Sequence, residues 1–210
     1  AVAASLAAEL QRARAQACNE LCNVDRTSTE LLEHPLGPHV PLVVALDLME
    51  PHEVGCLLRT CEAMRVRSVV LCGKSPAPCD PQVLKTSVSA QEHLSIEHRH
   101  CLGEAADELR NQGYAIWCLT GQSGSMRGES RKRAVNKVVY NVGHNNCDVV
   151  VPRPLALLVS GWHNPVDELV DVCEGQLCFP TDPESTPLSD SIAGSIAIYE
   201  IVHQWDVGGR

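Results

Sequence analysis

Aromatic side chains, long apolar runs and familiar nucleotide-binding signatures are all scarce in this chain of 210 residues. Aromatic residues make up only 3% of the sequence, so a core must be built from Val, Leu, Ile, Ala and Cys. No apolar run reaches the roughly 18 residues that a membrane-spanning helix requires. The motifs GxGxxG, GxxxxGKS/T and GxSxG are absent. Their absence argues against ordinary dinucleotide, nucleoside-triphosphate and serine-hydrolase sites.

Positive charge is also in short supply, because the formal net charge is −9. Non-specific attraction of the whole surface to nucleic acid or to an anionic membrane is therefore not expected. Contact with RNA would need a local basic patch, and one polar segment carries such a group of side chains: Arg127, Arg131, Lys132, Arg133 and Lys137. These residues are either an RNA-phosphate contact, a solvated loop or a surface for a protein partner. The first reading is favoured because the cluster stands out from an acidic chain.

Paired cysteines with metal-ligand spacing are missing, although the chain holds 11 cysteines. No CxxC or HxxxH pair completes four ligands, so no metal site is predicted. Several cysteines lie inside apolar segments, namely Cys56, Cys61, Cys72 and Cys118. That placement predicts reduced thiols in a reducing compartment, either the cytoplasm or the mitochondrial matrix. Because the sequence starts without Met, we expect a processed segment from which an import peptide could have been removed.

The apolar segments alternate between strand-like and helix-like patterns. Strands are predicted at 42–48, 68–72, 95–98, 114–119, 155–159 and 176–180, and helices at 50–65, 103–112 and from 190 to Trp205. Because the strands are continuous apolar runs, they indicate an α/β fold with a mostly parallel, doubly wound sheet. Residues 1–40 are expected to form a helical arm and connector, and residues 41–210 a single domain. The polar stretch 120–148 is interpreted as a loop.

The last helix is apolar on nearly every side. Ile192, Ile196, Tyr199 and His203 share one face, while Ile198, Ile201 and Val202 lie on others. A helix with so wide an apolar surface must be covered on more than one side. We therefore expect it to pack on its own sheet and also on a partner chain.

Four segments together resemble the SpoU/TrmH family of RNA 2′-O-ribose methyltransferases. DLMEPHEVGCLLRTCEAMRV at 47–66 is similar to the motif D-x-x-x-P-x-N-x-G-x-x-x-R-S/T-A. KTSVSAQEHL at 85–94 is similar to K-x-S-x-G-A-x-E-x-L. LALLVSGWHNPVDEL at 155–169 resembles a strand followed by G-x-E-x-x-G. CFPT at 178–181 and PLSDSIAGSIAIYE at 187–200 resemble I-P-M and S-L-N-V-S-x-A…Y-E.

The resemblance implies a SPOUT fold, in which the C-terminal segment of a doubly wound parallel sheet threads through a loop to form a trefoil knot. It also implies a site for S-adenosylmethionine in the knot and dimerisation through the knot helices. The cofactor would be bounded by strand ends and by the loop before the last helix. The matching residues are Leu119, Gly161, Phe179, Leu188, Ser189 and Ser191.

Several motif positions hold residues other than those of the family. The changed positions are Glu53, Ser89, His163, Val166, Pro187, Ser189 and Asp190, whereas Gly55, Arg59, Gly161, Ser191, Tyr199 and Glu200 are kept. Glu53 would place a carboxylate where RNA phosphate approaches, and Asp190 would place one near a buried cofactor. This pattern predicts a scaffold that has lost cofactor binding or catalysis, in other words a pseudoenzyme.

Arg59 is the arginine of the first motif, and it is kept in this chain. By resemblance, it would activate a ribose 2′-hydroxyl or hold an RNA phosphate. Alternatively, it is a surface arginine paired with Glu62 or Glu53, and the sequence leaves both readings open.

Three functions are consistent with these residues. The favoured one is a non-catalytic SpoU/TrmH-like protein that binds RNA or a ribonucleoprotein in rRNA maturation or ribosome assembly, as part of a homo- or heterodimer. The second is an active 2′-O-methyltransferase acting on rRNA or tRNA, in which Arg59 stabilises the ribose oxyanion and Ser189 and Ser191 hold S-adenosylmethionine. The third is a protein-interaction scaffold without RNA contact.

Overall fold

The computed structural model describes residues 40–120, 138–141, 150–161, 173–178, 186 and 188–208. Its elements in chain order are β1 Val40–Asp47, α2 Pro51–Ala63, β2 Val66–Cys72, α3 Pro81–Ser87, the 3-10 turn η1 Ala90–His93, β3 Ser95–Arg99, α4 Leu102–Asn111, β4 Ala115–Thr120, β5 Val138–Asn141, β6 Leu155–Ser160, β7 Gly175–Cys178 and α7 Asp190–Gly208. The expected helical arm, the proposed domain boundary near residue 40 and most of the knot-forming segments lie outside the described residues.

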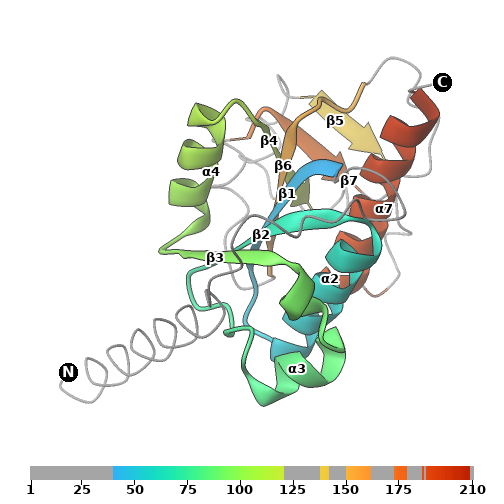
Figure 1. Cartoon of the computed structure of the whole chain (residues 1–210). Coiled ribbons are helices and arrows are strands. Elements are labelled where there is room, and N and C mark those ends of the chain that lie inside the picture. The colour runs from blue at the N-terminus through green and yellow to red at the C-terminus, as the bar shows by residue number, and fades with distance from the viewer. Residues whose placement is uncertain are drawn as a thin grey trace, which may run out of the picture.

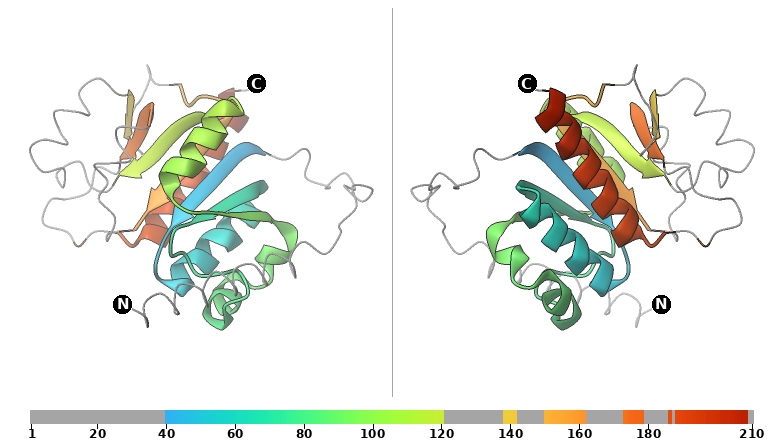
Figure 2. Two further views of the ribbon diagram at one scale, coloured as in Figure 1. Left: turned by 90° about the vertical axis from the view of Figure 1, so that its left-hand side faces the viewer. Right: turned by 90° about the vertical axis from the view of Figure 1, so that its right-hand side faces the viewer.

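Seven strands form one sheet in the order β3-β2-β1-β6-β4-β7-β5. Every paired neighbour runs parallel. Helix α4 covers one face of the sheet, and α2 and α7 cover the other (Figures 1 and 2). The predicted mixed α/β class with a parallel sheet is therefore confirmed.

The strands are apolar throughout because side chains from both of their faces are buried. In β1, Leu42, Val44 and Leu46 join the core beneath α2 and α7, whereas Val43 and Ala45 join the core beneath α4. This alternation follows from the two-residue period of a strand. A single strand therefore supplies two cores, which is why no polar position interrupts it.

The expected loop at 120–148 is partly wrong, because β5 lies within it and pairs in parallel with β7. This strand has only four residues and follows a strongly basic stretch, so its apolar pattern is too short to stand out. The segment at 83–94 is divided between α3 and η1.

Helix α2 explains the apolar spacing that follows residue 50. Pro51 stands at its start, where the missing N–H costs no helical hydrogen bond. Val54, Leu57, Leu58 and Cys61 are all fully buried. These four residues form the apolar face of the helix, and Arg59 lies off it on the exposed side.

The cysteines in the described ranges are thiols rather than disulfides. Cys61, Cys72 and Cys118 are buried, as expected, whereas Cys56 is half-buried. Burial raises the pKa of the Cys61 thiol to about 12. Burial also raises the pKa of the Cys72 thiol to about 12, and the negative charge of the nearby Asp47 carboxylate raises it further. Among the described residues, no helix is long and apolar enough to cross a membrane.

Ser89 adopts a left-handed backbone with φ of 64°, at the position where the related motif has glycine. This conformation is unfavourable for a residue with a Cβ atom. We expect Ser89→Gly to raise the free energy of unfolding by about 0.4–1 kcal/mol. Thermal unfolding followed by circular dichroism would measure the change.

The matched control is Ser95→Gly, because Ser95 is an exposed serine in the regular strand β3. Glycine in a strand interior costs roughly 0.5–1 kcal/mol, so this variant should melt earlier than the parent. If both variants shift in the same direction, the left-handed strain at Ser89 does not limit stability.

Candidate functional site

The carboxyl ends of β1 and β6 are joined at the edge of the sheet where parallel α/β proteins bind ligands. The N–H of Gly161 donates to the carbonyl of Asp47 over 3.1 Å. The hydroxyl of Ser75 donates to the carbonyl of Leu46 at 3.0 Å and accepts from the N–H of Leu48 at 2.9 Å. Both hydrogen bonds of Ser75 are buried, so the end of β1 is held in one place.

The start of α7 lies over this edge. The carbonyl of Ser189 accepts from the N–H of Ala193 at 2.9 Å, and its hydroxyl lies 3.3 Å from that of Ser191. Ser191 is buried, with 8% of its surface exposed. The two serine hydroxyls are therefore directed into the first turn of the helix.

Asp190 connects the helix to the strand. A Cβ atom at Gly161 would lie 3.3 Å from the Asp190 carboxylate and 3.7 Å from both the Asp47 carbonyl oxygen and Leu48 Cδ2. Hence the carboxylate rests directly on this glycine. We call Asp47, Gly161, Leu188, Ser189, Asp190 and Ser191 the strand-end site.

The structure brings together several of the residues expected to hold a cofactor. Gly161 lies against Asp190, and Leu188, Ser189 and Ser191 are close neighbours of Asp190 in the chain. Leu119 lies near the end of β4, in register with Leu177 of β7, and is 9% exposed. Phe179 and the basic residues lie outside the described residues, so their expected roles stay predictions: Arg127, Arg131, Lys132, Arg133 and Lys137.

Arg59 forms an ion pair with Glu62 of the same helix. This agrees with the interpretation of Arg59 as a paired surface arginine, and Glu62 rather than Glu53 is the partner. The Arg59 side chain is 52% exposed, and exposed ion pairs are weak. The Arg59 guanidinium is therefore paired with Glu62, but this weak ion pair does not hold it rigidly.

Glu53 lies differently from the expectation that it would face an approaching RNA phosphate. Only 8% of its surface is exposed, within the first turn of α2. The positive end of a helix dipole favours a carboxylate in this position. Glu53 is thus part of the packing at the start of the helix, and the expected repulsion of phosphate by an exposed carboxylate is wrong.

Gly55 is a position whose role the sequence alone does not reveal. A Cβ atom there would lie 2.6 Å from the carbonyl oxygen of Val83 and 3.0 Å from the backbone nitrogen of Ser87. The backbone of α3 therefore packs directly against α2 at this glycine. A motif glycine that could be taken for part of a ligand site serves helix–helix packing in this chain.

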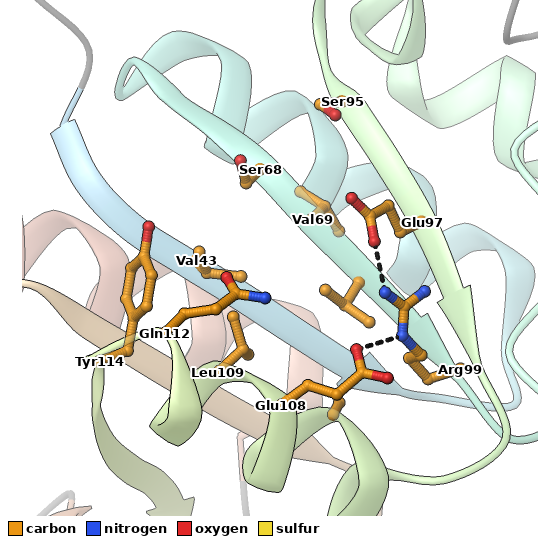
Figure 3. Close-up of a pocket in the computed structure, with 12 residues that line it drawn as sticks. Val43, Ser68, Val69, Ser95, Glu97, Arg99, Glu108, Leu109, Gln112 and Tyr114 are labelled. Carbon is orange, nitrogen blue, oxygen red and sulfur yellow. Dashed lines mark hydrogen bonds and ion pairs between the residues drawn. The ribbon is translucent and has the colours of Figure 1, made fainter.

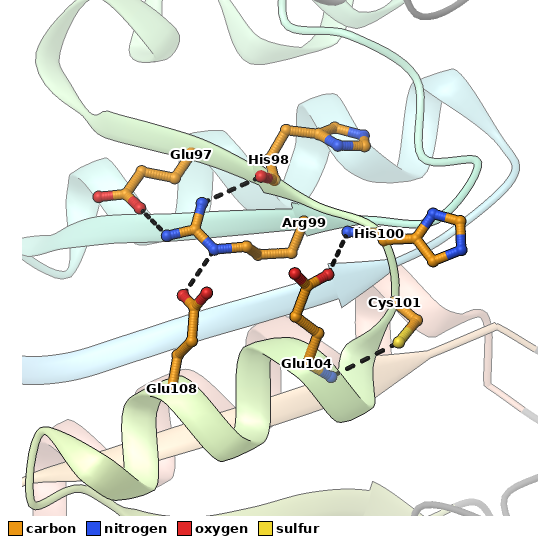
Figure 4. A network of polar contacts seen from close by, with 7 residues as sticks. All are labelled: Glu97, His98, Arg99, His100, Cys101, Glu104 and Glu108. Atoms are coloured by element: carbon orange, nitrogen blue, oxygen red, sulfur yellow. Dashed lines mark hydrogen bonds and ion pairs between the residues drawn. The ribbon is translucent and has the colours of Figure 1, made fainter.

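A second polar arrangement occupies the α4 side of the sheet. A cleft of about 90 Å³ is lined by residues of β1, β2, β3 and α4, among them Val43 and Leu109 (Figure 3). Across its rim, Arg99 donates to Glu97 and to Glu108, each at 2.6 Å (Figure 4). The hydrogen bond that Arg99 donates to Glu108 is the main reason that the pKa of Arg99 is raised. None of the lining residues belongs to the strand-end site, and we found no sequence signal for this cleft.

His98 contributes its backbone carbonyl to the same charge network, accepting from Arg99 Nη1 at 3.0 Å, while its ring points away from the network (Figure 4). Its pKa is lowered, first by burial and then by the positive charge of Arg99. A neutral imidazole beside a charged guanidinium is the expected outcome of both effects. Among the described residues, no group of three or more His, Cys, Asp or Glu side chains could hold a metal ion.

Taken together, the parallel sheet and the strand-end site define an α/β protein with a ligand-binding type of edge. The model of the SpoU rRNA Methylase family matches residues 41–147, which is about half of the chain. The chain therefore belongs to the SpoU rRNA methylase family.

Relatives and solved structures agree with this assignment. A putative TrmH family tRNA/rRNA methyltransferase of Staphylococcus haemolyticus is 27% identical over 161 residues, which cover 76% of this chain and 57% of the relative. The chain thus spans little more than half the length of that curated relative.

Two solved structures share the fold. The SpoU methyltransferase AviRb from Streptomyces viridochromogenes, in complex with AdoMet, superposes with a TM-score of 0.63 at 15% identity, covering 83% of this chain and 64% of that one. The A. aeolicus TrmH/SpoU tRNA modifying enzyme gives 0.60 at 17% identity, covering 95% and 86%. At these identities the likeness establishes the fold alone.

The space around Gly161 shows whether S-adenosylmethionine could contact the backbone at this position. Glycine there leaves room for a ligand to approach the backbone. In this chain the Asp190 carboxylate and Leu48 take up that room. The described residues therefore do not fit a methyl donor that rests on Gly161.

Proposed function

We propose that this chain is an RNA-binding member of the SpoU/TrmH family in which methyl transfer is impaired. It would act as half of a homo- or heterodimer in rRNA maturation or ribosome assembly. Its target would be RNA or a ribonucleoprotein, and its compartment the mitochondrial matrix or the cytoplasm. The C-terminal trefoil knot of the SPOUT fold is part of this proposal.

One observation supports the proposal most directly: two of the kept motif residues in the described region serve the fold. Gly55 allows α2 to pack on the backbone of α3, and Ser191 is buried in the first turn of α7. Arg59 is paired with Glu62 and so is not held ready for a ribose hydroxyl. Preserved packing with changed chemistry is what we expect of a scaffold retained for binding.

Dimerisation is supported by an apolar stripe on α7. Ile192, Ile196 and Tyr199 are 51%, 38% and 55% exposed, while Ile198, Ile201 and Val202 are buried in the core. The helix therefore covers its own sheet with one side and leaves a second apolar side for another surface. A second copy of this chain, or a related chain with the same helix, would offer an apolar surface that could cover this side.

RNA binding is assigned to the basic residues between Arg127 and Lys137. Replacing all five with glutamine should weaken binding to a fluorescein-labelled rRNA hairpin by about 10²-fold, because each lost contact also removes counterion release. The slope of log K against log salt should fall by about 3.5. Fluorescence anisotropy between 50 and 200 mM KCl, about the range over which such effects appear, would measure both.

Lys74→Gln/Lys85→Gln is the control, because both lysines are exposed and lie outside the basic segment of the sequence. This control should bind as the parent does. Equal affinity of the five-residue variant and the parent would favour a protein-interaction scaffold without RNA contact.

An active 2′-O-methyltransferase is the competing function. The structural similarity to AviRb, which was solved in complex with AdoMet, is the observation that favours it. Transfer of a tritiated methyl group from S-adenosylmethionine to rRNA or tRNA separates the two. We expect incorporation no higher than without protein. Incorporation that disappears in Arg59→Ala would establish the enzyme instead.

A further inference from the structure

We propose that Asp190 acts as an internal plug, whose carboxylate occupies the surface of Gly161 and closes the methyl-donor site by volume and not by charge. This inference rests on the proposed function, because it explains how a family member would have lost its cofactor. The proposed plug is a single side chain, so a single substitution should reopen the site.

The geometry of Gly161 carries the argument. The carboxylate lies 3.3 Å from the place that a Cβ atom would take, which is tight van der Waals contact. The Asp47 carbonyl oxygen and Leu48 Cδ2 also lie beside this place, both at 3.7 Å. The chain thus supplies its own atoms to the surface that glycine leaves open.

The position of Gly161 cannot shift to make room. Its N–H is bonded to the Asp47 carbonyl, and β6 is paired along its whole length with β1. Leu48, which follows Asp47, is fixed through the buried hydroxyl of Ser75. A ligand would therefore have to displace the Asp190 side chain rather than the strand.

The carboxylate is also favourably placed in electrostatic terms. Asp190 is the first residue of α7, where the partial positive charge at the start of a helix stabilises an anion. Displacing the side chain would forfeit this stabilisation. The plug is thus held by the helix that carries it.

Charge alone would have the opposite effect. S-adenosylmethionine carries a positive sulfonium, which a nearby carboxylate attracts. Occlusion by volume and attraction by charge therefore predict different results when the carboxylate is replaced. Asparagine keeps the volume and removes the charge, whereas alanine removes both.

The test is isothermal titration calorimetry of the full chain with S-adenosylmethionine and, separately, with uncharged S-adenosylhomocysteine. We expect the parent and Asp190→Asn to bind both compounds weakly and alike. Asp190→Ala and Asp190→Ser should each bind both compounds at least about 10-fold more tightly, which corresponds to 1.4 kcal/mol. Serine is included because it supports the start of a helix if alanine does not.

Asp107→Ala serves as the control, since Asp107 is an exposed aspartate on α4, on the other face of the sheet. It should leave both affinities unchanged, and thermal melting should show that all variants fold. The proposal is overturned if alanine and serine bring no gain, if asparagine gains as much as alanine, or if alanine binds S-adenosylmethionine more weakly than the parent.

These outcomes are separate from those of the proposed function. RNA affinity is measured on the same proteins without cofactor and should be equal in the parent and Asp190→Ala. If the calorimetric gain is absent while RNA still binds, only the plug is wrong. If RNA binding is absent while the gain occurs, the proposed function is wrong and the plug remains.

Discussion

Gly55→Ala should destabilise the protein by about 3 kcal/mol or more, near the upper end of what overpacking costs. The added methyl group would lie 2.6 Å from the carbonyl oxygen of Val83, and that atom belongs to the α3 backbone. A side chain could rotate away, but α3 must move as a unit. For a chain of this length the melting temperature should fall by about 6–12 °C, as measured by circular dichroism.

Gly103→Ala is the matched control, because Gly103 also lies in a helix but has no heavy atom closer to a Cβ than Cys101 Sγ at 3.8 Å. Alanine favours a helix over glycine by about 1 kcal/mol, so this variant should melt at an equal or higher temperature. A Gly55→Ala protein as stable as the parent would mean that α2 and α3 are not packed through this glycine. That result would also weaken the argument that kept motif residues serve the fold.

The effect of Gly55 differs from that of Ser89, although both stand at glycine positions of the related motifs. Sequence comparison marks the two positions equally, since it reports only which residue type occurs. The structure distinguishes the two positions. At residue 55 the neighbouring α3 backbone requires glycine, whereas at residue 89 the backbone φ of 64° favours glycine. The physical reason for a glycine therefore becomes available only with coordinates.

The strands and their direction could be predicted because their signal is local. The run at 42–48 is apolar without interruption, and β1 occupies Val40–Asp47. The strand β5 could not be predicted, because four residues give too few positions for a pattern. Burial of Glu53 was also missed, since a charged residue at the start of a helix is exposed in most settings.

The strand-end site was predicted in part, and only through the family resemblance. The motifs placed Gly161, Ser189 and Ser191 near one ligand, and the structure places them around one edge of the sheet. The resemblance also put Asp190 near the expected cofactor. It did not show that the carboxylate rests on Gly161, because contact between residues 29 positions apart depends on how α7 crosses the sheet. The motifs therefore identify residues of the site, whereas the contact between Asp190 and Gly161 depends on the fold.

Ile196→Glu/Tyr199→Glu should convert the protein from a dimer to a monomer. These residues are 38% and 55% exposed on α7, and Tyr199 stacks on His203 with ring centroids 5.7 Å apart. Residues at the centre of an interface typically contribute about 2 kcal/mol or more each. Two buried carboxylates should therefore weaken the dimer by about 10³-fold, which sedimentation velocity over a range of protein concentrations would measure.

Leu84→Glu is the control for this pair, because Leu84 is a 41% exposed apolar residue on α3 rather than on α7. It should leave the sedimentation coefficient of the dimer unchanged. A parent that is monomeric at 100 µM, roughly the weak limit for a stable assembly, would show that the α7 stripe is covered by something other than a second copy. A dimer that survives the double substitution would place the interface elsewhere, because two charges cannot be buried against an apolar partner without such a loss.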